Sequence, residues 1–218
     1  MSRTIALCCI LICHAQLATA QEAEVTDEQI DRLISELVSP NEAPTRRGPF
    51  AVYPEGYDKE AQRKVSNAHQ ALRKLGPKAF HRLFDHFDDK RFCLNGDGGE
   101  AQINKTVGQV CVHLVDSHLE PYSALGGPGS RFYQRSPRPP NYFAHFQLRD
   151  PKAAHEWWET HKEKSLKELQ IEVLEWVISE EVKLAEKYTD KDRDSMRKKL
   201  EDLRMQENPI PPAYLFAR

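Results

Sequence analysis

The sequence lacks a long hydrophobic run, and this limits how the protein can relate to a membrane. A helix that spans a bilayer needs about 20 mainly apolar residues. The apolar segment Ile5–Cys13 is far shorter, and later apolar stretches such as Val110–Val115 are interrupted by polar residues, here His113. We therefore expect no transmembrane anchor in the mature chain.

The sequence also lacks an excess of charge of one sign. Its 31 lysine and arginine residues almost balance its 33 aspartate and glutamate residues, and the formal net charge is -2. Proteins that attract nucleic acid or anionic lipid through their overall field are strongly basic. The balance of charge therefore argues against a nucleic-acid partner.

Cysteine is scarce outside the first residues of the chain. Of the five cysteines, only Cys93 and Cys111 lie beyond position 13. In an oxidising compartment these two can form a disulfide. The alternative is that Cys111 is a small buried residue in a helix and Cys93 is a thiol in a loop. Both interpretations stay open, because the spacing of two cysteines does not define their geometry.

Several catalytic motifs are missing. The sequence has no Gly-x-Ser-x-Gly, no His-Glu-x-x-His and no phosphate-binding loop that ends in Gly-Lys-Ser/Thr. The glycine-rich segment Asn95–Glu100 lacks the alternating acidic residues of a calcium loop. These absences favour a non-catalytic protein, and we expect no cofactor.

The first twenty residues of the sequence have the features of a secretory signal peptide. Arg3 supplies a positive charge, an apolar core follows, and Ala18-Thr19-Ala20 has the small-x-small pattern that signal peptidase cleaves. We interpret residues 1–20 as a signal peptide and Gln21 as the first mature residue. The protein is therefore predicted to be exported, either secreted or periplasmic.

The rest of the chain has the apolar periodicity of helices, with no strand-like alternation of useful length. We predict an all-α fold with a helical region at 21–122, an irregular Gly- and Pro-rich loop at 123–149, and a C-terminal helical region and tail at 150–218. The predicted helices are Asp27–Val38, Asp58–Leu75, Pro77–Phe87, Asn104–Leu119, Pro151–Lys187 and Asp190–Met205. We expect the last two to form a long-helix hairpin, and the apolar residues after Pro209 to dock on the body.

Part of the helical region resembles a HEAT-like repeat. Leu33–Pro40 (LISELVSP) and Leu83–Lys90 (LFDHFDDK) have a similar pattern, and Ala68–Pro77 (AHQALRKLGP) lies between them. Each helix pair of such a repeat leaves an apolar face that its neighbour covers. The resemblance covers Asp27–Leu119 and departs from the regular period at two insertions, Asn41–Tyr57 and Phe92–Gln102. The chain is similar to small exported bacterial proteins of unassigned function that carry such repeats, and this resemblance implies no activity.

One cluster of residues has the composition of a metal site. His81 and Asp85 are four residues apart and share a helix face, and His86 follows directly. Imidazole and carboxylate groups are ligands that zinc and other divalent ions accept. We take His81, Asp85 and His86 as a candidate site. The alternative is that the following acidic residues, Asp88 and Asp89, end the helix and the cluster is a solvated face.

A second candidate is an aromatic and basic segment. Its residues are Arg131, Tyr133, Arg138, Tyr142 and Phe143, and they lie among prolines that restrict the backbone. Flat apolar rings beside positive charges suit contact with a peptide or a glycan. The alternative is that the rings hold the long loop against the helices while the arginines stay in water.

These observations favour an exported, non-catalytic helical-repeat module that binds a protein or another envelope component. Two other classes of function stay open. One is a metal-dependent hydrolase that uses the His/Asp cluster, and the other is a glycan-binding module that uses the aromatic segment.

Overall fold

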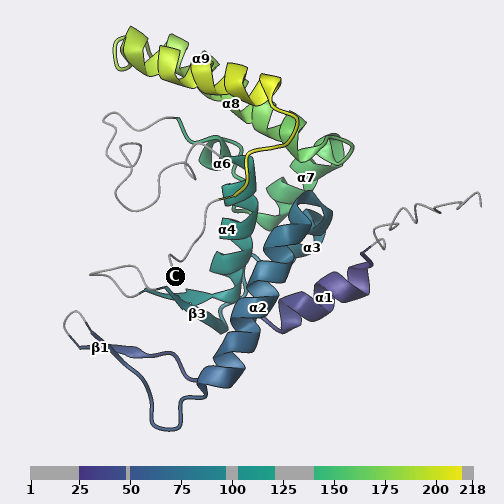
Figure 1. The fold of residues 1–218 in the computed structure, drawn as a ribbon, viewed down its shortest axis with the longest axis vertical. Helices are drawn as coiled ribbons and strands as arrows, with labels where there is room; N and C mark the ends of the chain where they lie inside the picture. The colour runs from purple at the N-terminus through teal and green to yellow at the C-terminus, as the bar shows by residue number, and fades with distance from the viewer. Residues whose placement is uncertain (1–24, 48–49, 97–102, 121–139, 213–218) are drawn as a thin grey trace, which may run out of the picture.

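The fold is predominantly helical, with two short β-hairpins at one end (Figure 1). This computed structural model describes residues 25–47, 50–96, 103–120 and 140–212. The helical elements are α1 (Asp27–Ser35), α2 (Lys59–Leu75), the 3-10 turn η1 (Gly76–Ala79), α3 (Phe80–Phe84), α4 (Val107–Leu119), α6 (Tyr142–His145), α7 (Pro151–His161), α8 (Leu166–Lys183) and α9 (Asp190–Met205). No helix in these ranges is long and apolar enough to cross a membrane.

Side-chain caps set the starts of several helices where the sequence predicts them. The Thr26 hydroxyl accepts from the Gln29 backbone N–H, and the Gln29 side chain in turn accepts from the Thr26 N–H. The Asp58 carboxylate accepts from two backbone N–H groups in the first turn of α2, and the Asp150 carboxylate accepts from the Ala153 backbone N–H at the start of α7. Caps of this kind satisfy helix N–H groups that have no partner within the helix.

The two β-hairpins were not predicted from the sequence. β1 (Thr45–Arg47) pairs antiparallel with β2 (Phe50–Val52), and β3 (Phe92–Gly96) pairs antiparallel with β4 (Ile103–Thr106). β1, β2 and β3 fall in the segments interpreted as irregular insertions, whereas β4 follows the second insertion and includes the start of the helix predicted from Asn104. Because each strand is only three to five residues long, it has too few positions to show an alternating pattern.

Two predicted helices have different bounds in the structure. The helix expected at Pro77–Phe87 is the short 3-10 turn η1 followed by α3, which ends at Phe84. The helix expected from Asn104 begins at Val107, because Thr106 caps it and the preceding residues form β4. At Gly108 a Cβ atom would meet the Phe87 carbonyl oxygen at 2.2 Å, so only glycine allows α4 to approach this closely.

The long helix expected at Pro151–Lys187 is two helices, α7 and α8. The chain leaves helical geometry after His161, and the Ser165 hydroxyl then accepts from the Glu168 backbone N–H to start α8. The predicted last helix, Asp190–Met205, has these bounds in the structure and packs along α8 (Figure 1). Its inner face contributes Met196, Leu200 and Leu203 to the core.

The core surrounds α4, which contacts α2 and α3 on one side and α8 on another. Apolar α4 residues such as Val110, Leu114 and Val115 are almost fully buried. A helix that is apolar on most of its circumference is typical of the centre of a domain. Aromatic residues close the side toward α7, where the Phe80 and Trp158 ring centroids are 5.6 Å apart.

The segment after α9 returns to the body, as predicted for its beginning. The buried Gln170 side chain accepts from the Ile210 backbone N–H at 2.9 Å and donates to the carbonyl oxygens of Ile210 and His118, each at 2.8 Å. The Arg73 guanidinium also donates to the Pro212 carbonyl oxygen. One buried amide therefore joins α8, the end of α4 and the tail. The apolar tail residues Tyr214, Leu215 and Phe216 lie outside the described residues.

Candidate functional site

The residues predicted to bind a metal point toward different partners. His81 Nε2 lies 2.9 Å from Asp27 Oδ1 on α1, while Asp85 Oδ1 lies 2.9 Å from His155 Nε2 on α7. Asp85 also pairs with Arg82 at 3.4 Å. No group of three potential metal ligands occurs among residues 25–47, 50–96, 103–120 and 140–212. The structure therefore does not bring His81 and Asp85 together as a metal centre.

The third predicted ligand, His86, lies on the same charged face. It contributes to lowering the pKa of Asp31 and of Asp89, although hydrogen bonds from Arg82 and Arg91 are the main causes. Arg82 donates two hydrogen bonds to Asp31, at 2.7 and 2.6 Å. These carboxylates are already bound by arginine, so this face acts as a set of ion pairs that joins helices.

The predicted aromatic binding surface is not exposed where the structure describes it. The side chains of Tyr142 and Phe143 are about 1% exposed. The Tyr142 hydroxyl accepts from Trp157 Nε1 at 3.0 Å and donates to Glu172 at 3.2 Å. The two rings hold α6 against the core, which is the alternative interpretation, and they offer no face to a glycan. Arg131, Tyr133 and Arg138 lie outside the described residues.

The two cysteines are buried free thiols in the structure. Cys93 lies at an irregularity in β3, and Cys111 lies on the inner face of α4. Burial raises the pKa of Cys93 to about 12, and burial together with the nearby Cys93 raises the pKa of Cys111. Protonated thiols are poor nucleophiles, so this pair does not form a catalytic centre.

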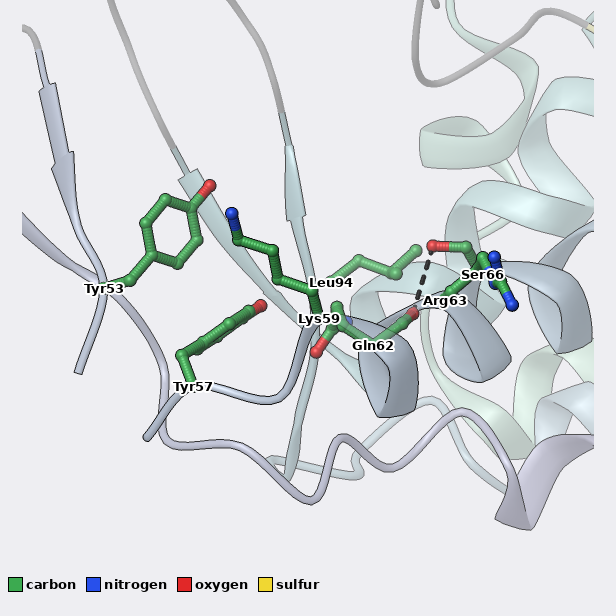
Figure 2. Close-up of a pocket in the computed structure, with 7 residues that line it drawn as sticks. All are labelled: Tyr53, Tyr57, Lys59, Gln62, Arg63, Ser66 and Leu94. Carbon is green, nitrogen blue, oxygen red and sulfur yellow. Dashed lines mark hydrogen bonds between the residues drawn. The ribbon is translucent and has the colours of Figure 1, made fainter. Parts of the chain in front are cut away.

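A pocket that the sequence did not reveal lies between α2, β3 and the segment that follows β2. Its volume is about 400 Å³, near the lower end of the range for ligand sites. Figure 2 shows the described residues that line it: Tyr53, Tyr57, Lys59, Gln62, Arg63, Ser66 and Leu94. Carboxylate, cysteine and histidine side chains are absent from this lining set.

The tyrosines are placed by a tight turn. The Tyr57 backbone N–H donates to the Pro54 carbonyl oxygen at 3.2 Å, and Gly56 has a φ of 76°, which favours glycine. This turn brings the ring centroids of Tyr53 and Tyr57 to 4.8 Å, with an angle of 65° between the rings. The rings therefore form a corner. Burial and the neighbouring Tyr53 raise the pKa of Tyr57, so its hydroxyl stays protonated at neutral pH.

The opposite wall is a polar stripe along α2. Lys59, Gln62, Arg63 and Ser66 follow the spacing i, i+3, i+4, i+7, so they occupy one face of the helix. The buried residues of α2, among them Val65 and Leu72, form the face that enters the core. The same helix therefore supplies both a core contact and one side of the pocket.

Gln62 is the rigid part of this wall. Its Oε1 accepts from the Ser39 hydroxyl at 2.7 Å and from Asn41 Nδ2 at 3.4 Å, while its Nε2 donates to the Cys93 carbonyl oxygen at 2.7 Å. Ser66 donates to the Gln62 backbone carbonyl at 3.3 Å. These bonds fix α2 against β3 and leave the amide of Gln62 with little capacity for a ligand.

The two cations of the pocket differ in their partners. Arg63 donates to Glu60 at 2.6 Å on the exposed side of α2. Within the part of the chain that the structure describes, Lys59 has neither a hydrogen bond nor an ion pair. In Figure 2 the Lys59 side chain extends on the side of the two tyrosines. Its ammonium group is therefore available to an anionic ligand.

A signal for this site is present in the sequence. Two tyrosines flank the turn residues Pro54-Glu-Gly56, and the polar stripe of α2 begins two residues later. From the sequence, the tyrosines are predicted only as part of an irregular segment. Their place beside Leu94 of β3 depends on contacts distant in sequence, which periodicity does not show.

No protein-family model, curated protein or solved structure matches the chain. The residues that line the pocket are therefore the basis for its expected chemistry. Phenol hydroxyls, an ammonium group and a guanidinium group can bind and orient a ligand, whereas catalysis by a nucleophile needs an adjacent base.

Proposed function

We propose that the chain is an exported, non-catalytic helical-repeat module that binds a protein partner, and that the pocket of Figure 2 is its contact site. The observation that carries this proposal is the composition of the lining: two tyrosines, an arginine and a lysine without a partner among the described residues, around a cavity of about 400 Å³. Tyrosine and arginine are enriched where proteins recognise partners.

The surroundings of the pocket support the same function. Val52 and Tyr53, at the end of β2, are large side chains that are 44% and 45% exposed. Exposed apolar residues beside a polar hollow are a feature of recognition surfaces. Export rests on the leader at residues 1–20, and the helical-repeat architecture rests on the resemblance of Asp27–Leu119.

Site-specific photocrosslinking tests this proposal. A photoreactive phenylalanine analogue at position 52 lies beside the pocket without lining it, and the same analogue at position 205 replaces Met205, which is 87% exposed. In the cells that make the protein, we expect a discrete protein adduct from position 52 that is absent from position 205.

A second variant ties the adduct to the pocket. Tyr57→Ala should remove most of the adduct from position 52, whereas Tyr57→Phe should retain it because the ring stays in place. Circular dichroism confirms that both variants are folded. The proposal is rejected if position 52 gives no protein adduct, or if positions 52 and 205 give the same ones.

A further inference from the structure

The placement of Lys59 and Arg63 on α2 is electrostatically unfavourable in the free protein. They lie at i and i+4, where like charges repel. Lys59 also lies in the first turn of α2, where the helix dipole favours negative charge. Natural sequences break local rules of this kind mainly at functional sites. A bound anion would relieve both conflicts.

Among the residues that the structure describes, no carboxylate lines the pocket beside Lys59. Glu60 pairs with Arg63 from the exposed face of the helix, and its side chain is 61% exposed. The Asp58 carboxylate is engaged with the backbone N–H groups of Glu60 and Ala61. The pocket thus has the ammonium group of Lys59 on the side of the two tyrosine rings.

We infer that the pocket binds a short acidic peptide segment, with a carboxylate at Lys59 and an adjacent apolar side chain in the corner between Tyr53 and Tyr57. This inference rests on the proposed binding function and names the chemistry of its partner. Two rings at 65° enclose a branched or aromatic side chain. A sugar ring instead stacks on a flat aromatic face, so the geometry favours a peptide over an acidic polysaccharide.

Fluorescence anisotropy with synthetic peptides tests the inference on the full mature chain. The probe is fluorescein-labelled Gly-Asp-Phe-Glu-Gly, and its matched control is the amide Gly-Asn-Phe-Gln-Gly. We expect the acidic probe to bind at least about tenfold more tightly than the amide, which corresponds to about 1.4 kcal/mol. Added salt should reduce this preference, because the charges are accessible to solvent.

Two lysines of α2 supply a matched pair of variants. Lys59→Met removes a charge that lines the pocket, whereas Lys64→Met removes an exposed charge from the same helix that does not line it. Lys59→Met should weaken binding of the acidic probe about tenfold, and Lys64→Met should change it less than twofold. Equal effects of the two variants would show a diffuse electrostatic attraction and would overturn the inference.

The tyrosine corner has a separate test. Tyr57→Ala should weaken binding of the phenylalanine-containing probe more than binding of Gly-Asp-Ala-Glu-Gly. An oligogalacturonate that binds more tightly than every acidic peptide would instead assign the pocket to an acidic polysaccharide. If photocrosslinking at position 52 succeeds while the acidic probe does not bind, this inference fails and the proposed function stands. If the crosslink also fails, both are rejected.

Discussion

Histidines occupy two contrasting settings in this molecule. His69 on α2 and His118 on α4 are buried, and His113 on α4 is partly buried. His81 and His155 lie at the contacts of α3 with α1 and α7, where each faces a carboxylate 2.9 Å away and is more than one-third exposed. We call these the buried group and the exposed group. The comparison shows that the contribution of a histidine to stability depends on its access to solvent.

The buried group is held in the neutral form. Burial, with a smaller effect of Arg73, lowers the pKa of His69 to about 4. Burial and the neighbouring His69 lower the pKa of His113 to about 4 as well. The exposed group instead forms part of the surface ion pairs that the sequence suggested as a metal site.

The largest expected difference between the groups appears on acidification. Between pH 6.5 and about 4 the unfolded chain binds protons at His69 and His113 that the folded chain does not, so the free energy of unfolding falls as pH falls. For each histidine, the difference in pKa between the unfolded and the folded chain corresponds to about 3 kcal/mol. Asp116 opposes part of this loss, because burial raises its pKa to about 6. We expect a net loss on the order of 3 kcal/mol, measured by urea unfolding at several pH values.

Variants separate these contributions. His113→Gln should make the free energy of unfolding less dependent on pH between 6.5 and 4, because one suppressed titration is removed. The parent protein is the reference for this comparison. A pH profile of His113→Gln identical to that of the parent protein would show that His113 does not contribute to the pH dependence.

The next largest effect is expected from His118→Ala. The ring of His118 packs against Phe80 with centroids 5.8 Å apart, and its two nitrogens lie 2.5 Å from the Leu114 oxygen and 3.0 Å from the Arg73 oxygen. Removing the ring leaves a cavity and takes the single N–H donor of the neutral imidazole from one of these carbonyl groups. We expect a loss of about 2–3 kcal/mol in the free energy of unfolding.

The exposed counterpart of that variant is His155→Ala, which should cost less than about 1 kcal/mol because its pair with Asp85 is solvated. Chemical denaturation of both proteins at pH 7 makes the comparison. Losses of similar size would contradict the assignment of His118 to the core.

An effect of similar size is expected beside the exposed group, at Arg82. Its two hydrogen bonds to Asp31 join α3 to α1, and they lower the pKa of Asp31. Arg82→Ala should cost about 1 kcal/mol, and less in high salt, since both side chains are about one-third or more exposed. The contribution is present above the unfolded pKa of Asp31 and is lost as pH falls through the lower folded value. If Arg82→Ala is as stable as the parent protein in both low and high salt, the pair of Arg82 and Asp31 does not contribute to stability.

Local signals in the sequence predicted much of the helical structure. The starts of α1 and α7 follow from capping residues, and the bounds of α9 agree with the prediction. The break between α7 and α8 was missed because the apolar stripe continues across it. Ser165 and Glu168 do carry the capping-box pattern, which is a signal that outweighs periodicity.

The candidate site was harder to predict than the fold. His81 and Asp85 share a helix face as expected, yet they bind residues from two other helices, and sequence spacing contains no information about those partners. Tyr142 and Phe143 have the composition of a surface cluster, but they are core residues. The pocket is lined by Leu94 of β3 and by residues of α2. These are distant in sequence, and only the tertiary structure brings them together.

The bonds of Gln170 also constrain the order in which the molecule folds. Its amide joins the His118 carbonyl, 52 residues earlier, to Ile210, 40 residues later. Until the later segment arrives, burying that amide leaves polar atoms without partners, which opposes premature closure of α8 onto α4. During synthesis on a ribosome this delays consolidation of the core until residue 210 has emerged, and it couples the interior of the protein to a segment without regular secondary structure.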